Sequence, residues 1–157
     1  MDEVHRPTLP GARGTRVSLH WHRHYDRTAM TSVRVVAAVV RRGDMLLVGR
    51  RPFEKRHGGM WEFPGGKIDP GETPGNAARR ELAEELELTV TAVRPMLYAV
   101  KDDASPFVIE FYPVDTTGEP IAHEHSEVTW LTMEELTELA LAPADEAFVR
   151  WLADTRN

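Results

Sequence analysis

Short apolar runs separated by turn residues dominate the chain after residue 30. Val33–Val40 and Met45–Val48 flank Arg42-Gly43-Asp44, a pattern that predicts a β-hairpin. A short strand is expected at Met60–Phe63, where Pro64-Gly65-Gly66 would end it. Later apolar stretches predict further strands around Thr89–Val100, Phe107–Val114 and Glu127–Leu131.

Helical periodicity begins after a proline. Thr73 is a suitable N-cap, Pro74 suits the first helical position, and apolar residues then recur every fourth position to Leu86. Two later helices are predicted, from Thr132 to Leu141 and over Pro143–Asp154. Strands before, between and after helices predict an α+β fold in which a mixed sheet lies between helices.

The first 30 residues differ from the remainder. Prolines and glycines interrupt them, and they hold five arginines but three acidic side chains. We expect residues 1–30 to form a disordered extension and residues 31–157 to form one domain, a usual size for a domain.

The composition excludes several classes of protein for this chain. The chain has no cysteine, which excludes disulfides and thiol catalysis, and no apolar run of the roughly 18 residues that a membrane helix needs. We therefore expect a cytoplasmic protein without a membrane partner. The net charge of −6 argues against binding of a nucleic-acid polymer, but a divalent cation would still allow small polyanions to bind.

The candidate chemistry lies on the helix that follows Thr73. Glu81, Glu84 and Glu85 are spaced i, i+3 and i+4, so they share one face. A solvated helix face is one explanation, since glutamate is a good helix former. The alternative is a site for a hard divalent cation, which prefers carboxylate oxygens. Glu72 and the Gly65-Gly66 corner nearby favour the cation site.

These residues resemble a known sequence motif. Gly66, five residues, Glu72, seven residues and then Arg80-Glu81-Leu82-x-Glu84-Glu85 are similar to the Nudix box. The resemblance spans about residues 33–155 and is nearest to MutT-like enzymes of the 8-oxo-dGTP diphosphatase and CTP pyrophosphohydrolase type. It implies the Nudix α/β/α sandwich. The box has glycine where this chain has Glu87, which must end the helix differently or accept strain.

The resemblance also implies roles for the box residues. Glu81, Glu84 and Glu85, with the carbonyl of Gly65, would hold Mg²⁺ or Mn²⁺. Arg80 would orient the glutamates, and Glu72 would brace the loop. Glu124 is the candidate for a further catalytic and metal-binding glutamate, or else a surface carboxylate. A water activated by cation and carboxylate would attack phosphorus in line.

Three residues are candidates for substrate binding. The resemblance suggests that Arg51 contacts the nucleotide, unless it is an exposed strand arginine. Phe63 would stack on a base or belong to the core. Asp145 stands where 8-oxoguanine-specific relatives have asparagine, and it either reads the base or caps a helix. An ionised aspartate only accepts hydrogen bonds, so amino groups of cytosine or guanine would suit it.

The implied function is hydrolysis of a nucleoside triphosphate to monophosphate and diphosphate, which would sanitise the nucleotide pool. Both 8-oxo-dGTP and modified cytidine nucleotides remain open as substrates. Alternatives are another diphosphate, such as ADP-ribose or a dinucleoside polyphosphate, and a non-catalytic nucleotide sensor. The partner would be a small nucleotide, and the protein would be a monomer or homodimer.

Overall fold

The computed structural model describes residues 32–102 and 104–156, so the predicted extension over residues 1–30 lies outside the described residues. None of the described helices is long and apolar enough to cross a bilayer. The strands are β1 (Val33–Arg42), β2 (Met45–Arg50), β3 (Trp61–Glu62), β4 (Gly65–Lys67), β5 (Thr89–Val93), β6 (Tyr98–Lys101), β7 (Phe107–Thr117) and β8 (Glu127–Thr132). The helices are α1 (Pro74–Leu86), α2 (Met133–Thr137) and α3 (Pro143–Thr155).

The strands form a mixed sheet, which confirms the predicted architecture. Its central order is β3-β2-β1-β7-β5, while β4 pairs with β1, β6 with β7 and β8 with β2. β1 and β7 run parallel, in register from Val33 opposite Phe107 to Val40 opposite Val114. The pairings of β2 with β1, β3 and β8 are antiparallel.

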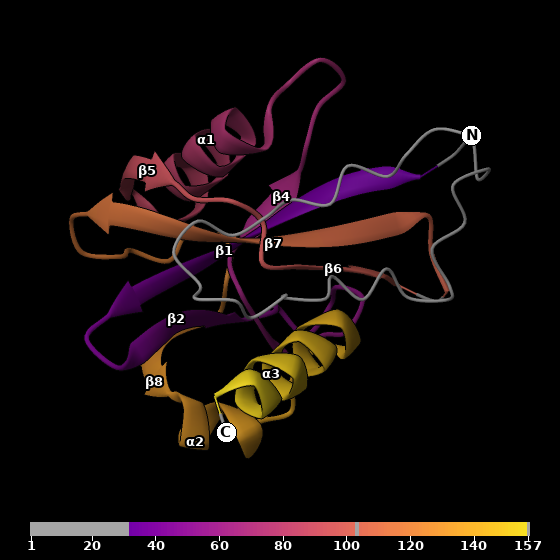
Figure 1. Cartoon of the computed structure of the whole chain (residues 1–157), viewed down its shortest axis with the longest axis vertical. Coiled ribbons are helices and arrows are strands. Elements are labelled where there is room, and N and C mark those ends of the chain that lie inside the picture. Colours follow the sequence, from indigo (N-terminus) through magenta and orange to yellow (C-terminus); the bar gives the residue numbers. More distant parts are fainter. Residues whose placement is uncertain (1–31, 103, 157) are drawn as a thin grey trace.

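Helices cover both faces of the sheet, with α1 on one side and α2 and α3 on the other (Figure 1). β1 supplies both cores, because successive side chains of a strand point to opposite faces. Val36 and Val40 pack in the core cluster that includes Leu82 of α1. Ala37 and Val39 pack in the cluster that includes Phe148 of α3. A strand buried on both faces explains the continuous apolar run at Val35–Val40.

The glycine corner ends the preceding strand as predicted, since β3 stops at Glu62, but it also forms a strand that the sequence did not predict. Gly65–Lys67 is β4, with Gly66 opposite Val36 of β1. The lack of a side chain allows this pairing, since a Cβ on Gly65 would lie 1.8 Å from the carbonyl oxygen of Val36. Glycine is thus required here for close approach of two backbones.

Two element boundaries also differ. The single strand predicted over Thr89–Val100 is two strands, β5 and β6, with Pro95 between them, a residue that cannot donate to a ladder. α2 ends at Thr137 rather than Leu141. There the chain turns back to β3, where Leu141 forms a bridge with Trp61.

The helix α1 begins and ends close to where the sequence predicts. The Thr73 hydroxyl accepts a hydrogen bond from the Asn76 N–H at 3.1 Å, and Pro74 occupies the first turn. Glu87 ends the helix in the left-handed conformation, with φ 55°. The Leu88 N–H then donates to the Leu82 carbonyl at 3.2 Å, as in a glycine-terminated helix. Glu87 therefore keeps the backbone shape of the glycine it replaces.

Candidate active site

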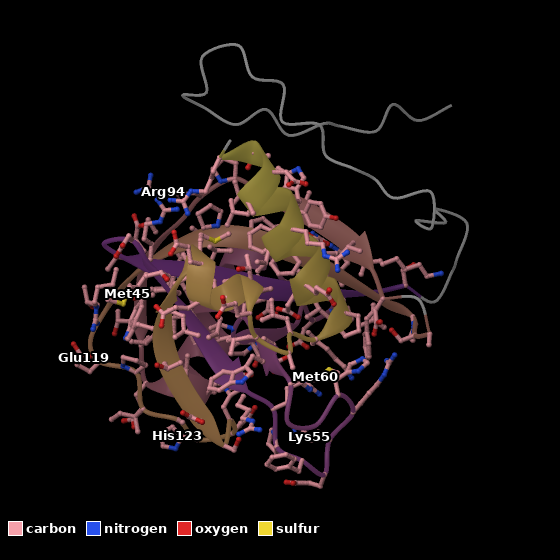
Figure 2. The ribbon with its side chains drawn as sticks, turned by 90° about the horizontal axis from the view of Figure 1, so that it is seen from below. Met45, Lys55, Met60, Arg94, Glu119 and His123 are labelled. Carbon is pink, nitrogen blue, oxygen red and sulfur yellow. The ribbon has the colours of Figure 1, made fainter. Side chains whose placement is uncertain are left out.

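A cavity of about 380 Å³ opens where the ends of β1–β4 meet α1 and α3. This volume lies within the range of about 300–1,000 Å³ usual for small-molecule sites. Figure 2 shows Lys55 and His123 toward the same end of the molecule, on the loop after β2 and the loop before β8. The cavity is lined by Val35, Val36, Ala37, Arg51, Pro52, Lys55, Glu62, Phe63, Gly65, Gly66, Lys67, Glu85, Ile109, Glu124, His125 and Asp145.

Glu85 is the buried carboxylate of the site. Only 5% of the residue is exposed, and its Oε2 atom has no hydrogen-bond partner among the described residues. Burial raises the pKa of Glu85 well above its usual range, and Glu81, Glu124 and Glu62 raise it further. A partnerless buried oxygen among like charges is the environment that a cation would stabilise.

Arg80 connects the helix to the loop before it. Its Nε and Nη2 groups donate to the two oxygens of Glu72 at 3.0 and 2.9 Å, and Nη1 donates to Glu81 Oε1 at 2.7 Å. A fourth hydrogen bond runs from Nη2 to the Lys67 carbonyl at 3.0 Å. The Arg80 guanidinium and the Asp69 N–H hold the pKa of Glu72 down at about 2. Glu72 thus accepts from both the loop backbone and the helix.

Glycine lets the Glu81 carboxyl lie against β4. A Cβ on Gly66 would be 2.3 Å from Glu81 Cδ. Gly65 lines the cavity beside Gly66 and is paired with Ala37 of β1. The two glycines therefore bring backbone and carboxylates into close contact at one edge of the cavity.

Not all the predicted ligands converge. Glu84 does not line the cavity: 61% of its side chain is exposed, and it approaches Arg80 at 3.9 Å. Glu124 lines the cavity and acts electrostatically on Glu85. Within the described residues, no three His, Asp or Glu side chains are already gathered closely enough to hold an ion.

Arg51 lies between two cavities. It lines the larger one and a second one of about 190 Å³ that also reaches Arg56 and Asp102. Its Nη1 donates to both oxygens of Glu62, at 2.9 and 3.1 Å, and its Nε donates to the Arg56 carbonyl at 2.6 Å. Three quarters of the Arg51 side chain is buried, so it is not a freely exposed strand arginine.

The backbone of Phe63 contacts the side chain of Asp145. Phe63 is 3% exposed, and its ring packs edge-on against that of Phe148 with the ring centroids 5.4 Å apart. Of the two roles considered for Phe63, base stacking and core packing, this position corresponds to core packing. The Phe63 N–H donates to Asp145 Oδ1 at 2.9 Å. Asp145 is not the N-cap of α3, which is Ala142, so the capping alternative is wrong. Asp145 borders both cavities instead.

Sequence reasoning missed two residues of the site. Glu62 and His125 are neither apolar core nor part of the box, yet both line the larger cavity and hydrogen-bond to each other. The available signals were a charged residue in a short apolar strand and a histidine beside Glu124. Neither signal says which distant residue is the partner.

The donor set fits a hard divalent cation, because it consists of carboxylates with a buried oxygen that lacks a partner. The residues available to hold one are Glu81, Glu84, Glu85 and Glu124, with the Gly65 carbonyl. The cavity is also lined by three cationic side chains, which would suit a phosphate-bearing ligand: Arg51, Lys55 and Lys67.

The mixed sheet between helices, with the glutamate-bearing helix α1 beside the cavity, has the architecture of a Nudix-type sandwich. The model of the NUDIX domain matches residues 31–152, and the chain belongs to that family. It is a Nudix hydrolase with MutT-like relatives.

Named relatives agree with this assignment. The chain is 36% identical over 127 residues to a CTP pyrophosphohydrolase of Escherichia coli, a match that covers 76% of this chain and 93% of the relative. It is 38% identical over 101 residues to an 8-oxo-dGTP diphosphatase of Haemophilus influenzae, covering 61% and 73%. A MutT NUDIX hydrolase from Burkholderia pseudomallei has a similar fold, with TM-score 0.69 and 26% identity over 77% of this chain and 98% of that one.

Proposed function

We propose that the protein is a Mg²⁺- or Mn²⁺-dependent pyrophosphohydrolase that cleaves a nucleoside triphosphate to monophosphate and diphosphate. The observation that carries this proposal is the partnerless Glu85 oxygen in the same cavity as Arg51 and Asp145. One cavity thus offers a cation site and, beside it, groups suited to a nucleotide. The activities named for the relatives, on CTP and on 8-oxo-dGTP, support this substrate class.

The chain's own residues would divide the work in the following way. Glu81, Glu84, Glu85 and Glu124 would hold the cation, which supplies positive charge against the phosphates and activates water. Arg80 positions Glu81 while it is itself held by Glu72. Arg51 would bind the phosphate or sugar, and Lys55 and Lys67 would add positive charge. A carboxylate of the cavity takes the proton of the attacking water as the phosphorus–oxygen bond to diphosphate breaks.

Asp145 would select the base. Its carboxyl is held by the Phe63 N–H, and the residue lines the same cavity as Arg51 and Glu85. We propose 8-oxo-dGTP and cytidine nucleotides, modified ones included, as the substrates to compare. Such an activity would serve to sanitise the nucleotide pool.

The test is release of diphosphate from 8-oxo-dGTP, dGTP, CTP, dCTP and 5-methyl-dCTP, with ADP-ribose included, each with and without Mg²⁺. We expect diphosphate from at least one triphosphate, abolished by a chelator. Cleavage of ADP-ribose alone would overturn the proposed substrate class. Turnover that survives chelation would overturn the cation.

The first variant to test is Glu85→Gln. It keeps the shape of the side chain but removes the charge that would bind the cation, so we expect turnover to fall by about 10²–10⁴-fold. Glu138→Gln is the matched control, because Glu138 is exposed and follows α2, which packs on the opposite face of the sheet from α1. Equal activity of the two variants would contradict the assignment of Glu85.

A further inference from the structure

His125 occupies a place made for its ring. It lies in the loop before β8, with 5% of its side chain exposed, against Gly49 of β2. A Cβ on Gly49 would lie 2.5 Å from His125 Cδ2, so any larger residue at position 49 would displace the ring. The ring is therefore fixed on one side by backbone.

The polar contacts of His125 point toward the substrate side of the cavity. Its Nε2 donates to Glu62 Oε1 at 3.1 Å, since a carboxylate can only accept. Its Nδ1 is buried without a partner among the described residues. With the proton on Nε2, Nδ1 is the bare nitrogen of the ring, so no buried N–H is left unpaired.

Glu62 contacts both His125 and Arg51, so it connects the two side chains. The two Glu62 oxygens both accept from Arg51 Nη1, so the carboxylate is held between the histidine and the guanidinium. Glu62 and Arg51 side chains are about one fifth and one quarter exposed, which limits competition from water. Arg51 Nη2 takes part in neither the Glu62 contact nor the Arg56 contact.

We propose that His125 is a positioning residue which, through Glu62, fixes the guanidinium of Arg51 for binding of the nucleotide. This inference rests on the proposed function, because that function assigns Arg51 to the nucleotide. A ring that merely filled space against Gly49 would not need its contact with Glu62.

Two substitutions separate hydrogen bonding from filling of space. In His125→Gln the amide nitrogen extends about as far as the imidazole Nε2 and can still donate to Glu62, whereas in His125→Asn it is too short. We expect His125→Asn to raise the KM for the nucleotide roughly tenfold, as suits loss of a hydrogen bond to a charged group, with a smaller change in kcat. His125→Gln should restore most of the loss. Mn²⁺ affinity should be unchanged in both variants.

A double-mutant cycle tests whether the effect passes through Glu62. If it does, His125→Asn should raise the KM no further when Glu62→Ala, which removes the acceptor, is already present. His123→Asn is the control from the same loop, because His123 contacts Glu87 at 2.8 Å at a half-exposed position and should leave the KM unchanged. Additive effects of His125→Asn and Glu62→Ala would overturn the proposal.

A second readout needs no substrate. Hydrogen exchange of the Arg51 Nη1 protons, which donate to Glu62, should be faster in His125→Asn than in the wild-type protein and near normal in His125→Gln when it is measured by NMR. Unchanged exchange in His125→Asn, or equal exchange in both variants, would overturn the proposal. If the wild-type protein cleaves no triphosphate, the proposed function fails and this exchange measurement alone decides the role of His125.

Discussion

Asp145 has a carboxyl group that the fold buries almost completely, with 6% of the residue exposed. Burial raises its pKa well above the usual value, and the negative charge of Glu62 acts in the same direction. The Phe63 N–H and the charge of Arg51 offset this only in part. An ionised Asp145 therefore destabilises the folded protein, which is tolerable where a residue is kept for binding.

This gives a prediction for unfolding as a function of pH. A carboxyl whose pKa is raised by folding binds its proton more tightly in the native state, so its contribution to stability is complete below the unfolded pKa of about 3.8 and is lost as pH rises. Asp145→Asn removes this loss. The variant should gain stability relative to the wild type as pH rises, by up to about 1.4 kcal/mol per pH unit. Urea unfolding from pH 5 to pH 8 measures the difference between the free energies of unfolding of the variant and the wild type.

Asp154→Asn is the matched control, because Asp154 lies on the same helix but is exposed. Its stability should follow that of the wild type across this range. A gap between Asp145→Asn and wild type that does not change with pH would show that Asp145 is not under this strain.

Glu87 determines how the helix α1 ends. Its left-handed φ of 55° is costly for a residue with a Cβ, by roughly 1 kcal/mol, but its carboxylate contacts His123 Nε2 at 2.8 Å. Both contact groups are half-exposed, and such a pair contributes about 0–1 kcal/mol. The cost of the left-handed conformation and the gain from the contact with His123 are therefore of similar size in the free energy of unfolding.

Comparison of two variants isolates the backbone strain. Glu87→Ala and Glu87→Gly both remove the carboxylate, but only glycine adopts the left-handed conformation without strain. We expect Glu87→Gly to be more stable than Glu87→Ala by about 1 kcal/mol in denaturant unfolding. Equal stability would mean that the helix ends differently in the alanine variant.

The sequence predicted elements with strong local signals and missed those that depend on distant partners. Thr73 and Pro74 sit at the start of α1 because capping is a local interaction. β4 escaped prediction because a Gly-Gly corner forms a strand only where β1 provides a partner. The box residues followed from spacing on one helix, whereas the contact between Glu62 and His125 joins residues 63 positions apart. No periodic pattern encodes such a pair.

The molecule as a whole is acidic, with a net charge of −6, and Glu85 and Glu124 line its main cavity. A ligand that binds only the folded state stabilises it by mass action, by about 2.7 kcal/mol when present at 100 times its Kd. Mg²⁺ should therefore raise the midpoint of thermal unfolding, and Glu85→Gln should abolish the rise. NaCl at equal ionic strength controls for screening of surface charge. An equal rise with NaCl would remove this support for a specific site.

The parallel pairing of β1 with β7 has a consequence for how the enzyme folds. Val36 lies opposite Glu110, and β2, β3, β4, α1, β5 and β6 all lie between these strands in the chain. Closing so long a loop costs entropy before its contacts form, and non-local pairing of this kind slows folding. During synthesis, the carboxylate helix leaves the ribosome before β7 does. The glutamates of α1 are therefore made early but acquire their cavity only after a late, long-range event.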